Sequence, residues 1–408
     1  MHNLSSISTD YFLNPAFQPK APYGEQRARI LNAGGLARAE QEITAWPGYQ
    51  VTPQHALGAL AQALGVAAIH YKDEGSRFGL GSFKALGGAY AVGRQLCRVL
   101  GQRLGRDVQP SELLHGELRQ AASDITVTCA TDGNHGRSVA WGAQLFGCRC
   151  VIYIHATVSE GRKQAIERFG AQVARTAGNY DAAVRQADHD ARENGRHVIS
   201  DTSYPGYMDV PRDVMQGYQL MVQEAVQQLD AWPTHVFVQA GVGGLAAAVC
   251  AYFWERDAQQ RPFFAVVEPT RADCLLQSAR NGRLTAVTGE LDTLMAGLAC
   301  GEVSLLAWEI LERGANAFCT VDDDAAIAVM QLLARPQGRD AAIVAGESAV
   351  AGLAAAIGIA RDPEARAAFG FDAESRILFF GSEADTDPAL YLQLVGASAA
   401  EILDGMPA

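Results

Sequence analysis

The segment Val236-Phe237-Val238-Gln239-Ala240-Gly241-Val242-Gly243-Gly244-Leu245 decides the fold class of this 408-residue chain. Its apolar first part predicts a buried strand, and its glycines precede a helix that we expect at 246–256. A further strand is predicted at 263–267. Strands separated by helices of this length pair in parallel, so the segment predicts a βαβ unit of an α/β protein.

The same alternation begins upstream of this segment, near residue 124. One helix is expected to begin after Ser159, a good N-cap residue, and to stop at Gly170. We expect strands at 125–129, 151–154, 171–176 and 197–200, and helices at 135–146, 159–169 and 180–194. This order predicts a doubly wound parallel sheet.

Composition describes an ordinary globular protein, with 49% hydrophobic and 19% charged residues. A formal charge of −12 argues against nucleic acid or an anionic membrane as a partner, because both require a basic face. No apolar run of about 18 residues and no secretory signal are visible. The eight cysteines show no Cys-x-x-Cys spacing. We therefore expect structural thiols, no bound metal and a cytoplasmic protein.

Lys84 is the most reactive candidate in the sequence. It follows Ser82-Phe83 and precedes the small-residue run Ala85-Leu86-Gly87-Gly88-Ala89. Burying a lysine is costly, so such a side chain either reaches water or reacts as a neutral amine. Downstream lie the polar loop 130–136 and the glycine loop 240–245. Together, the lysine and these two loops predict a pyridoxal phosphate site, in which Lys84 forms the Schiff base and the glycine loop binds the phosphate.

The glycine loop also has a second interpretation. Gly241 to Ala246 fits G-x-G-x-x-A, and Glu268 follows 27 residues after Gly241, which is an approximate dinucleotide fingerprint. In both interpretations glycines let the backbone approach an anion at a helix N-terminus. A dinucleotide loop normally follows the first strand of its unit, whereas this one comes after several elements. A single phosphate is therefore the better occupant, and a dinucleotide-binding oxidoreductase stays as a distant alternative.

Taken together, these stretches resemble the fold type II pyridoxal phosphate enzymes, the tryptophan synthase β-like group. Within that group they are most similar to the diaminopropionate ammonia-lyase family. The resemblance covers about residues 70–390. It rests on Tyr71-Lys72-Asp73-Glu74, Arg77-Phe78-Gly79-Leu80, Phe83 to Gly88, Ala130 to Arg137, Asp201-Thr202, Gly206-Tyr207, Met215-Gln216-Gly217-Tyr218, Met295 to Glu302, Gly346-Glu347-Ser348 and Asp385-Thr386-Asp387-Pro388.

The resemblance implies two open-sheet α/β domains with the cofactor between them. It divides the chain into a large domain (1–88 and 206–408) and a small domain (89–205). Lys84 would hold the cofactor aldehyde, Asn134 its phenolic oxygen and Thr386 its pyridine nitrogen. The phosphate would be held by Gly241, Val242, Gly243, Gly244 and Leu245. The substrate carboxylate would be bound by backbone amides of the loop that contains Thr131, Asp132, Gly133 and His135.

Asp132 and Asp201 are the candidate carboxylates for a cationic substrate group, and Glu347 is a further candidate substrate contact. Asp201 ends a predicted strand, where α/β sheets bind ligands. These carboxylates favour αβ-elimination of 2,3-diaminopropionate to pyruvate and ammonia, because an ammonium is bound best by carboxylates. Gly81, Ser82 and Ala349 depart from the family pattern, which leaves a serine or threonine dehydratase as the close alternative. A binding protein on the same fold is a third. The resemblance also implies a homodimer.

Overall fold

The computed structural model describes residues 7–131, 133–178 and 180–404, so Asp132 lies outside the described residues. The chain forms two compact units. The first contains 1–32, 51–76 and 221–408, and the second contains 33–50 and 77–220. The second unit includes the whole predicted small domain, 89–205. It also takes in Lys84, which the sequence-based division placed in the first part of the large domain.

A seven-stranded sheet organises the described part of the first unit, in the order β1-β10-β9-β8-β11-β3-β2. The five central strands are parallel, and β1 and β2 run antiparallel at the edges. The strands are β1 Asp10–Leu13, β2 Gln54–Ala56, β3 Ala68–Asp73, β8 His235–Gln239, β9 Phe263–Pro269, β10 Ala317–Val321 and β11 Arg376–Gly381.

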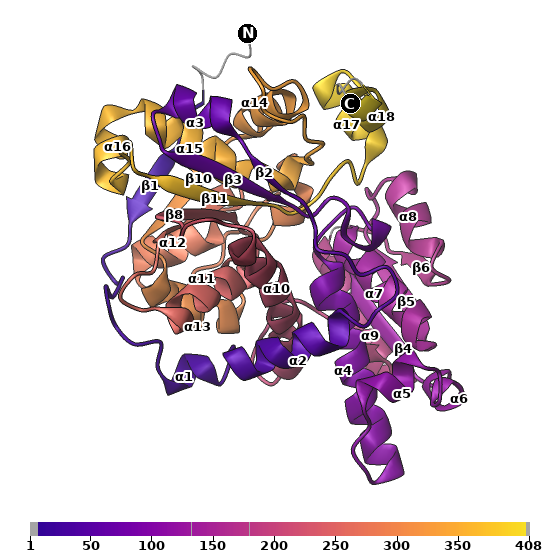
Figure 1. Cartoon of the computed structure of the whole chain (residues 1–408). Helices are drawn as coiled ribbons and strands as arrows, with labels where there is room; N and C mark the ends of the chain where they lie inside the picture. The colour runs from indigo at the N-terminus through magenta and orange to yellow at the C-terminus, as the bar shows by residue number, and fades with distance from the viewer. Residues whose placement is uncertain (1–6, 132, 179, 405–408) are drawn as a thin grey trace. The chain divides into compact units, whose positions relative to one another are not determined.

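Helices cover both faces of this sheet, with α15 on one face and α11, α12 and α13 on the other (Figure 1). In α15 a Cβ at Gly352 would lie 3.1 Å from the Phe237 carbonyl oxygen, so small residues let this helix pack close to β8. The helices of the unit are α1 Glu25–Ala28, α3 Gly58–Leu64, α11 Gly244–Arg256, α12 Cys274–Asn281, η3 Ala296–Leu298, α13 Leu305–Gly314, α14 Asp323–Ala334, η4 Glu347–Ala349, α15 Ala351–Arg361, α16 Pro363–Phe369, α17 Pro388–Val395 and α18 Ala399–Asp404.

The second unit contains a four-stranded parallel sheet, in the order β6-β5-β4-β7. Its strands are β4 Thr126–Ala130, β5 Arg149–Ile154, β6 Gln172–Arg175 and β7 His197–Val198. Its helices are α2 Ala33–Ile43, η2 Arg77–Gly79, α4 Ala85–Leu104, α5 Pro110–Leu114, α6 Arg119–Ala122, α7 Asn134–Phe146, α8 Glu160–Glu167 and α9 Tyr180–Asn194, while α10 Asp209–Gln227 begins here and ends in the first unit.

Small residues bring helices α4 and α7 into close contact. A Cβ at Gly142 of α7 would lie 2.7 Å from the Cα of Ala89 in α4, and one at Gly88 would lie 1.9 Å from the Ser138 hydroxyl. Larger side chains at these positions would separate the helices. Lys84 immediately precedes α4 and Asn134 begins α7, so this packing places two predicted site residues near each other.

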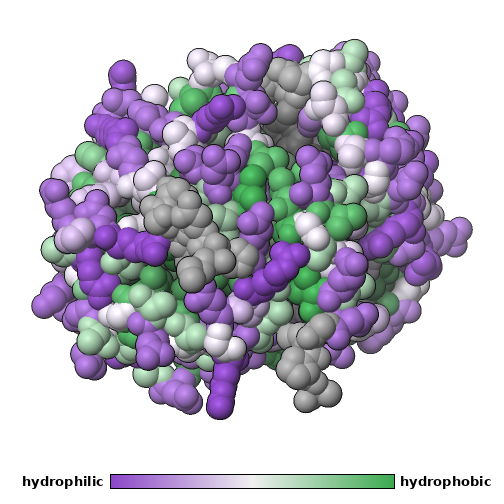
Figure 2. All heavy atoms as spheres, turned by 90° about the horizontal axis from the view of Figure 1, so that it is seen from above, coloured by the Kyte–Doolittle hydropathy of each residue, from purple (hydrophilic) through white to green (hydrophobic). Residues whose placement is uncertain are grey.

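The parallel sheets confirm the predicted α/β class, and most predicted elements lie within a few residues of the observed ones. Ser159 caps α8 as expected, since its hydroxyl accepts a hydrogen bond from the Arg162 N–H at 3.2 Å. Hydrophilic side chains cover most of the face shown in Figure 2. Among the described residues, no helix is both long and apolar enough to cross a bilayer.

Candidate active site

Lys84 and Asp201 form the central contact of the site in the second unit. The Lys84 Nζ lies 2.7 Å from Asp201 Oδ2, and each side chain is 20% exposed. Burial raises the pKa of Asp201, but the charge of the Lys84 ammonium and its hydrogen bond lower it by more, so the net pKa lies below the ordinary value. Asp201 is therefore an ionised carboxylate at neutral pH. The pair therefore places a reactive amine, Lys84, next to a carboxylate, Asp201, that stabilises positive charge.

His135 lies beside this pair at the start of α7. Its Nε2 is 2.7 Å from the Ile199 carbonyl oxygen, and its Nδ1 is 3.9 Å from Asp201 Oδ2. Burial lowers the pKa of His135, and the Lys84 ammonium lowers it as well, against the opposing effect of Asp201. A neutral imidazole next to Asp201 is the result.

The loop between β4 and α7 is shaped by the buried Thr131 side chain. Its hydroxyl accepts hydrogen bonds from the backbone N–H groups of Gly133 and Gly136, both at 3.0 Å. This arrangement fixes the loop at the N-terminal end of α7, where unpaired N–H groups favour an anion. Asn134 begins α7, one residue before the predicted start of this helix. The prediction for Asp132 concerns a position outside the described residues.

The segment before Lys84 contains Gly81, one of the departures from the family pattern. Gly81 has φ of +75°, a left-handed conformation that glycine adopts without strain. Arg137 of α7 is buried and donates to the Leu80 carbonyl oxygen at 2.8 Å, which holds this segment in place. Neither role was predicted from the sequence.

Tyr218 is a neighbour of Lys84 that sequence reasoning missed. Its buried ring packs on Phe83, with 4.6 Å between centroids, and Lys84 Nζ lies 5.9 Å from the ring centroid. Burial raises the pKa of Tyr218, and the nearby Lys84 ammonium offsets part of that effect. The motif Met215 to Tyr218 was part of the resemblance, but nothing in it indicated this contact.

The glycine loop lies in the first unit and begins α11. Gly243 caps the helix with φ of +97°, and Gly244 and Leu245 form its first turn. A Cβ at Gly241 would lie 2.8 Å from the Cys300 sulfur and 3.3 Å from the Gly297 carbonyl oxygen. A side chain at Gly241 would therefore collide with the segment 297–300, so this position needs a glycine. The N-terminus of a helix such as α11 suits a phosphate.

Hydrogen bonds connect this loop region to Thr386. The Gly297 N–H donates to the Ser348 hydroxyl at 3.0 Å, and the Ser348 N–H donates to Glu383 Oε1 at 3.0 Å. The Thr386 hydroxyl lies 3.3 Å from Glu383 Oε2. Glu383, which follows β11, was missed, although the carboxyl end of a parallel strand is where such residues are expected. Glu347 is buried in η4 beside Ser348.

Glu268 does not fit the dinucleotide alternative. Its side chain is completely buried, and its two carboxylate oxygens accept the N–H groups of Leu275 and Leu276, each at 2.8 Å. It therefore stabilises the first turn of α12. A ribose-binding carboxylate would have to reach a ligand, so the resemblance of this loop to a dinucleotide fingerprint is misleading.

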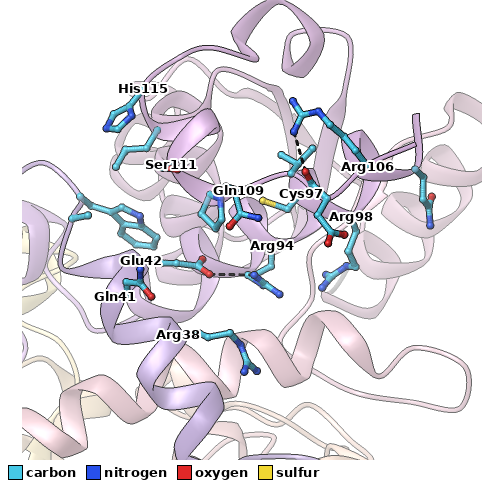
Figure 3. Close-up of a pocket in the computed structure, with 18 of the residues that line it drawn as sticks. Arg38, Gln41, Glu42, Arg94, Cys97, Arg98, Arg106, Gln109, Ser111 and His115 are labelled. Atoms are coloured by element: carbon cyan, nitrogen blue, oxygen red, sulfur yellow. Dashed lines mark hydrogen bonds and ion pairs between the residues drawn. The ribbon is translucent and has the colours of Figure 1, made fainter. Parts of the chain in front are cut away.

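A separate cavity of about 980 Å³ lies in the second unit, lined by residues of α2, α4, α5 and the segment 105–109 (Figure 3). Three of the four arginines that line it pair with carboxylates: Arg94 with Glu42 at 3.1 Å, Arg98 with Asp213 at 2.6 Å and Arg106 with Glu112 at 2.6 Å. None of the described site residues predicted from the sequence lines this cavity. It is distinct from the Lys84 site.

In each unit, taken by itself, the chemistry suits pyridoxal phosphate. In the second unit Lys84 supplies an amine. In the first unit the N-terminus of α11 suits one phosphate, and Thr386 supplies a hydroxyl. A family model for "pyridoxal-phosphate dependent enzyme" matches residues 45–380, and the chain belongs to that family. The predicted cofactor and the fold type II class are thereby confirmed.

Individual relatives show which members of this family the chain is similar to. The chain is 38% identical over 390 residues to the diaminopropionate ammonia-lyase of Salmonella typhimurium, covering 91% of this chain and 95% of that protein. It also matches the crystal structure of the holo diaminopropionate ammonia-lyase from Escherichia coli with a TM-score of 0.87 and 35% identity, covering 96% and 97% of the two chains. Another structure of that enzyme, in complex with an aminoacrylate-PLP azomethine reaction intermediate, matches with a TM-score of 0.85. The family predicted from the motifs is confirmed.

Proposed function

We propose that this chain is an ammonia-lyase that converts 2,3-diaminopropionate into pyruvate and ammonia by αβ-elimination. The identity of 38% with diaminopropionate ammonia-lyases over nearly the whole chain supports the substrate. The observation that carries the proposal is the contact between Lys84 and Asp201, because it joins an amine for the cofactor to a carboxylate for a cationic substrate group.

The proposed cofactor contacts are those that the family resemblance implies. Lys84 would hold it covalently, residues 241–245 would bind its phosphate, and Thr386 would contact its pyridine nitrogen. Asn134 would contact its phenolic oxygen. When bound, pyridoxal phosphate serves as an electron sink for the negative charge that develops at the substrate Cα.

Residues of the chain would bind the charged groups of the substrate and accept its Cα proton. The loop of Thr131, Gly133 and His135 would bind the substrate carboxylate through backbone N–H groups. The Lys84 amine would accept the Cα proton from one face of the substrate, and Asp201 would orient the β-ammonium. Asp132 is the proposed carboxylate for the opposite face. Glu347 is a proposed substrate contact.

Pyruvate release tests this function. Purified protein loaded with pyridoxal phosphate is supplied separately with diaminopropionate, serine and threonine, and pyruvate or 2-oxobutyrate is measured with ammonia. We expect the highest kcat/KM with diaminopropionate and two ammonia molecules per pyruvate. A higher kcat/KM with serine or threonine would replace the proposal by the dehydratase function.

We further propose a cytoplasmic homodimer in which residues 89–205 act as a small domain. Support for the compartment comes from the eight free thiols, which are typical of reducing conditions. The dimer is supported only by the resemblance, so sedimentation equilibrium is the decisive measurement. A mass of about 87 kDa is expected, twice the 43.5 kDa of one chain. A mass of one chain would exclude the dimer.

A further inference from the structure

The imidazole of His135 faces Asp201 with a nitrogen that has no hydrogen-bond partner in the part of the chain that the structure describes. A carbonyl oxygen only accepts hydrogen bonds, so the 2.7 Å contact with Ile199 places a proton on Nε2 of His135. In a neutral ring Nδ1 is then an acceptor. This atom is buried and has no hydrogen-bond partner among the described residues. The whole residue is only 8% exposed.

The alternative is a charged imidazolium that pairs with Asp201. Two neighbours act on that equilibrium in opposite directions: Asp201 favours the charged ring and the Lys84 ammonium disfavours it. Burial is the largest effect and lowers the pKa of His135. The neutral ring is therefore the resting form. Two acceptors, Nδ1 and Asp201 Oδ2, then face each other at 3.9 Å and need a donor.

In this structure the Lys84 ammonium supplies a donor to Asp201, at 2.7 Å. Once Lys84 holds the cofactor, its nitrogen no longer carries three N–H donors. The Asp201 carboxylate is then left without that cation, and the neighbouring imidazole nitrogen still needs a donor. A substrate ammonium restores it. A hydroxyl has one hydrogen to donate, whereas an ammonium has three and can serve both acceptors at once.

We propose that Nδ1 of His135 accepts a hydrogen bond from the β-ammonium of the substrate, together with Asp201, and so selects an ammonium over a hydroxyl as the leaving group. This inference rests on the proposed function. It assigns His135 as a specificity-determining residue, in addition to the proposed use of its backbone N–H.

Two variants separate this role from a structural one. In His135→Gln the side-chain amide can still donate to the Ile199 carbonyl oxygen, but the acceptor at the Nδ1 position is lost. In His135→Asn a polar group remains near the Nδ1 position, but the side chain is too short to reach Ile199. Each variant is compared with the wild type using diaminopropionate and serine, the latter followed as substrate or competitive inhibitor.

The glutamine variant should lose about 10- to 100-fold in kcat/KM for diaminopropionate, as expected for a hydrogen bond to a charged group. Its loss for serine should be at least about tenfold smaller. If the loss is equal for both ligands, or if only His135→Asn is impaired, His135 is structural and the inference is wrong. If the wild type itself does not turn over diaminopropionate, the proposed function has failed instead.

A second readout does not depend on turnover. Among the nine histidines, ¹⁵N-labelled His135 can be assigned from the signal that disappears in His135→Gln. We expect its neutral Nε2–H tautomer at about pH 7 to 8 in the holoenzyme. A protonated Nδ1 in this range would overturn the inference, because that nitrogen could not accept a hydrogen bond.

Discussion

The amine of Lys84 and the carboxylate of Asp201 are in direct contact at 2.7 Å although 117 positions separate them in the chain. Lys84 precedes α4, and Asp201 follows β7 at the carboxyl end of a parallel strand. The fold of the second unit therefore creates the contact from two segments that have no local relationship. Because the pKa of Asp201 is below its ordinary value, its charge persists through neutral pH.

We expect Asp201→Asn to reduce turnover of diaminopropionate by about 10²-fold or more while cofactor binding survives. The substitution keeps the shape of the side chain and removes the charge that would hold the β-ammonium. Steady-state kinetics measures the turnover. Borohydride reduction with peptide mapping checks that the cofactor is still attached at Lys84. A label on another lysine would contradict the assignment.

Asp213→Asn is the matched control. Asp213 has a comparable exposure of 18% and pairs with Arg98 at 2.6 Å in the same unit, but it lines neither part of the proposed site. It should affect thermal stability without a comparable effect on turnover. Equal kinetic losses in the two variants would show that the loss in Asp201→Asn reflects general destabilisation.

The alternation of apolar runs and polar helices was sufficient to predict most elements. The helix expected at 180–194 has these bounds in the structure, and Ser159 caps α8 as its hydroxyl chemistry requires. Such features depend on short-range patterns, which a single sequence contains. Lys84 and Asp201 were predicted for the same reason, from the segments on which they lie.

Contacts between distant segments could not be predicted in this way. Nothing in the sequence near Tyr218 indicates that it lies beside Lys84. Nothing near Glu383 indicates that it connects Ser348 to Thr386. Glu268 had the spacing of a ribose-binding residue, yet its carboxylate caps α12. These roles depend on the register of strands and on the packing of helices, which spacing along the chain does not encode.

A buried ion pair in the first unit gives a stability prediction. Lys72 Nζ lies 3.0 Å from Glu224 Oε2 and 2.8 Å from both the Thr52 carbonyl oxygen and Gln228 Oε1. The two side chains are 0% and 2% exposed. Lys72→Met would leave the Glu224 charge buried without its cation, so we expect a loss of about 3–5 kcal/mol in the free energy of unfolding.

The double variant Lys72→Met with Glu224→Leu removes both charges together. Replacing a buried pair by apolar residues is often neutral or stabilising, so this variant should recover most of the loss. Urea unfolding followed by circular dichroism measures both. If the double variant were as unstable as the single one, the hydrogen bonds to Thr52 and Gln228 would matter more than the charge balance.

Glu42 should make stability depend on pH near neutrality. Burial raises its pKa to about 7, against the opposing effect of Arg94. The native state then holds a proton that the unfolded state releases between about pH 4.5 and 7, so stability falls as the pH rises through this window. The contribution is roughly 3 kcal/mol. Glu42→Gln should flatten this slope in unfolding experiments across that pH range.

Glu112 provides a control with the opposite sign. A hydrogen bond from Arg106 lowers its pKa to about 2, so its contribution is present above the ordinary pKa and is lost as the pH falls toward 2. Glu112→Gln should lower stability above about pH 4.5, where this contribution is complete, and should change the pH dependence of stability only below that pH. A pH slope near neutrality that persists in Glu42→Gln would assign the titration to another group.

The glycine loop gives the sharpest test of the cofactor site. Gly243 has φ of +97°, and a Cβ there would lie 3.1 Å from the Ala307 Cβ. Gly243→Ala should therefore shift the loop and weaken pyridoxal phosphate binding by about tenfold or more, because in the proposed site the backbone N–H groups at the start of α11 bind the phosphate. Equilibrium dialysis gives the dissociation constant directly.

Gly282→Ala is the control, because Gly282 has φ of +60° with open space around it at the end of α12. Both variants carry the cost of a left-handed alanine, about 1–2 kcal/mol, so both should lose stability to a similar extent. Only Gly243→Ala should lose affinity for the cofactor. Equal dissociation constants in the two variants would mean that the phosphate is bound elsewhere.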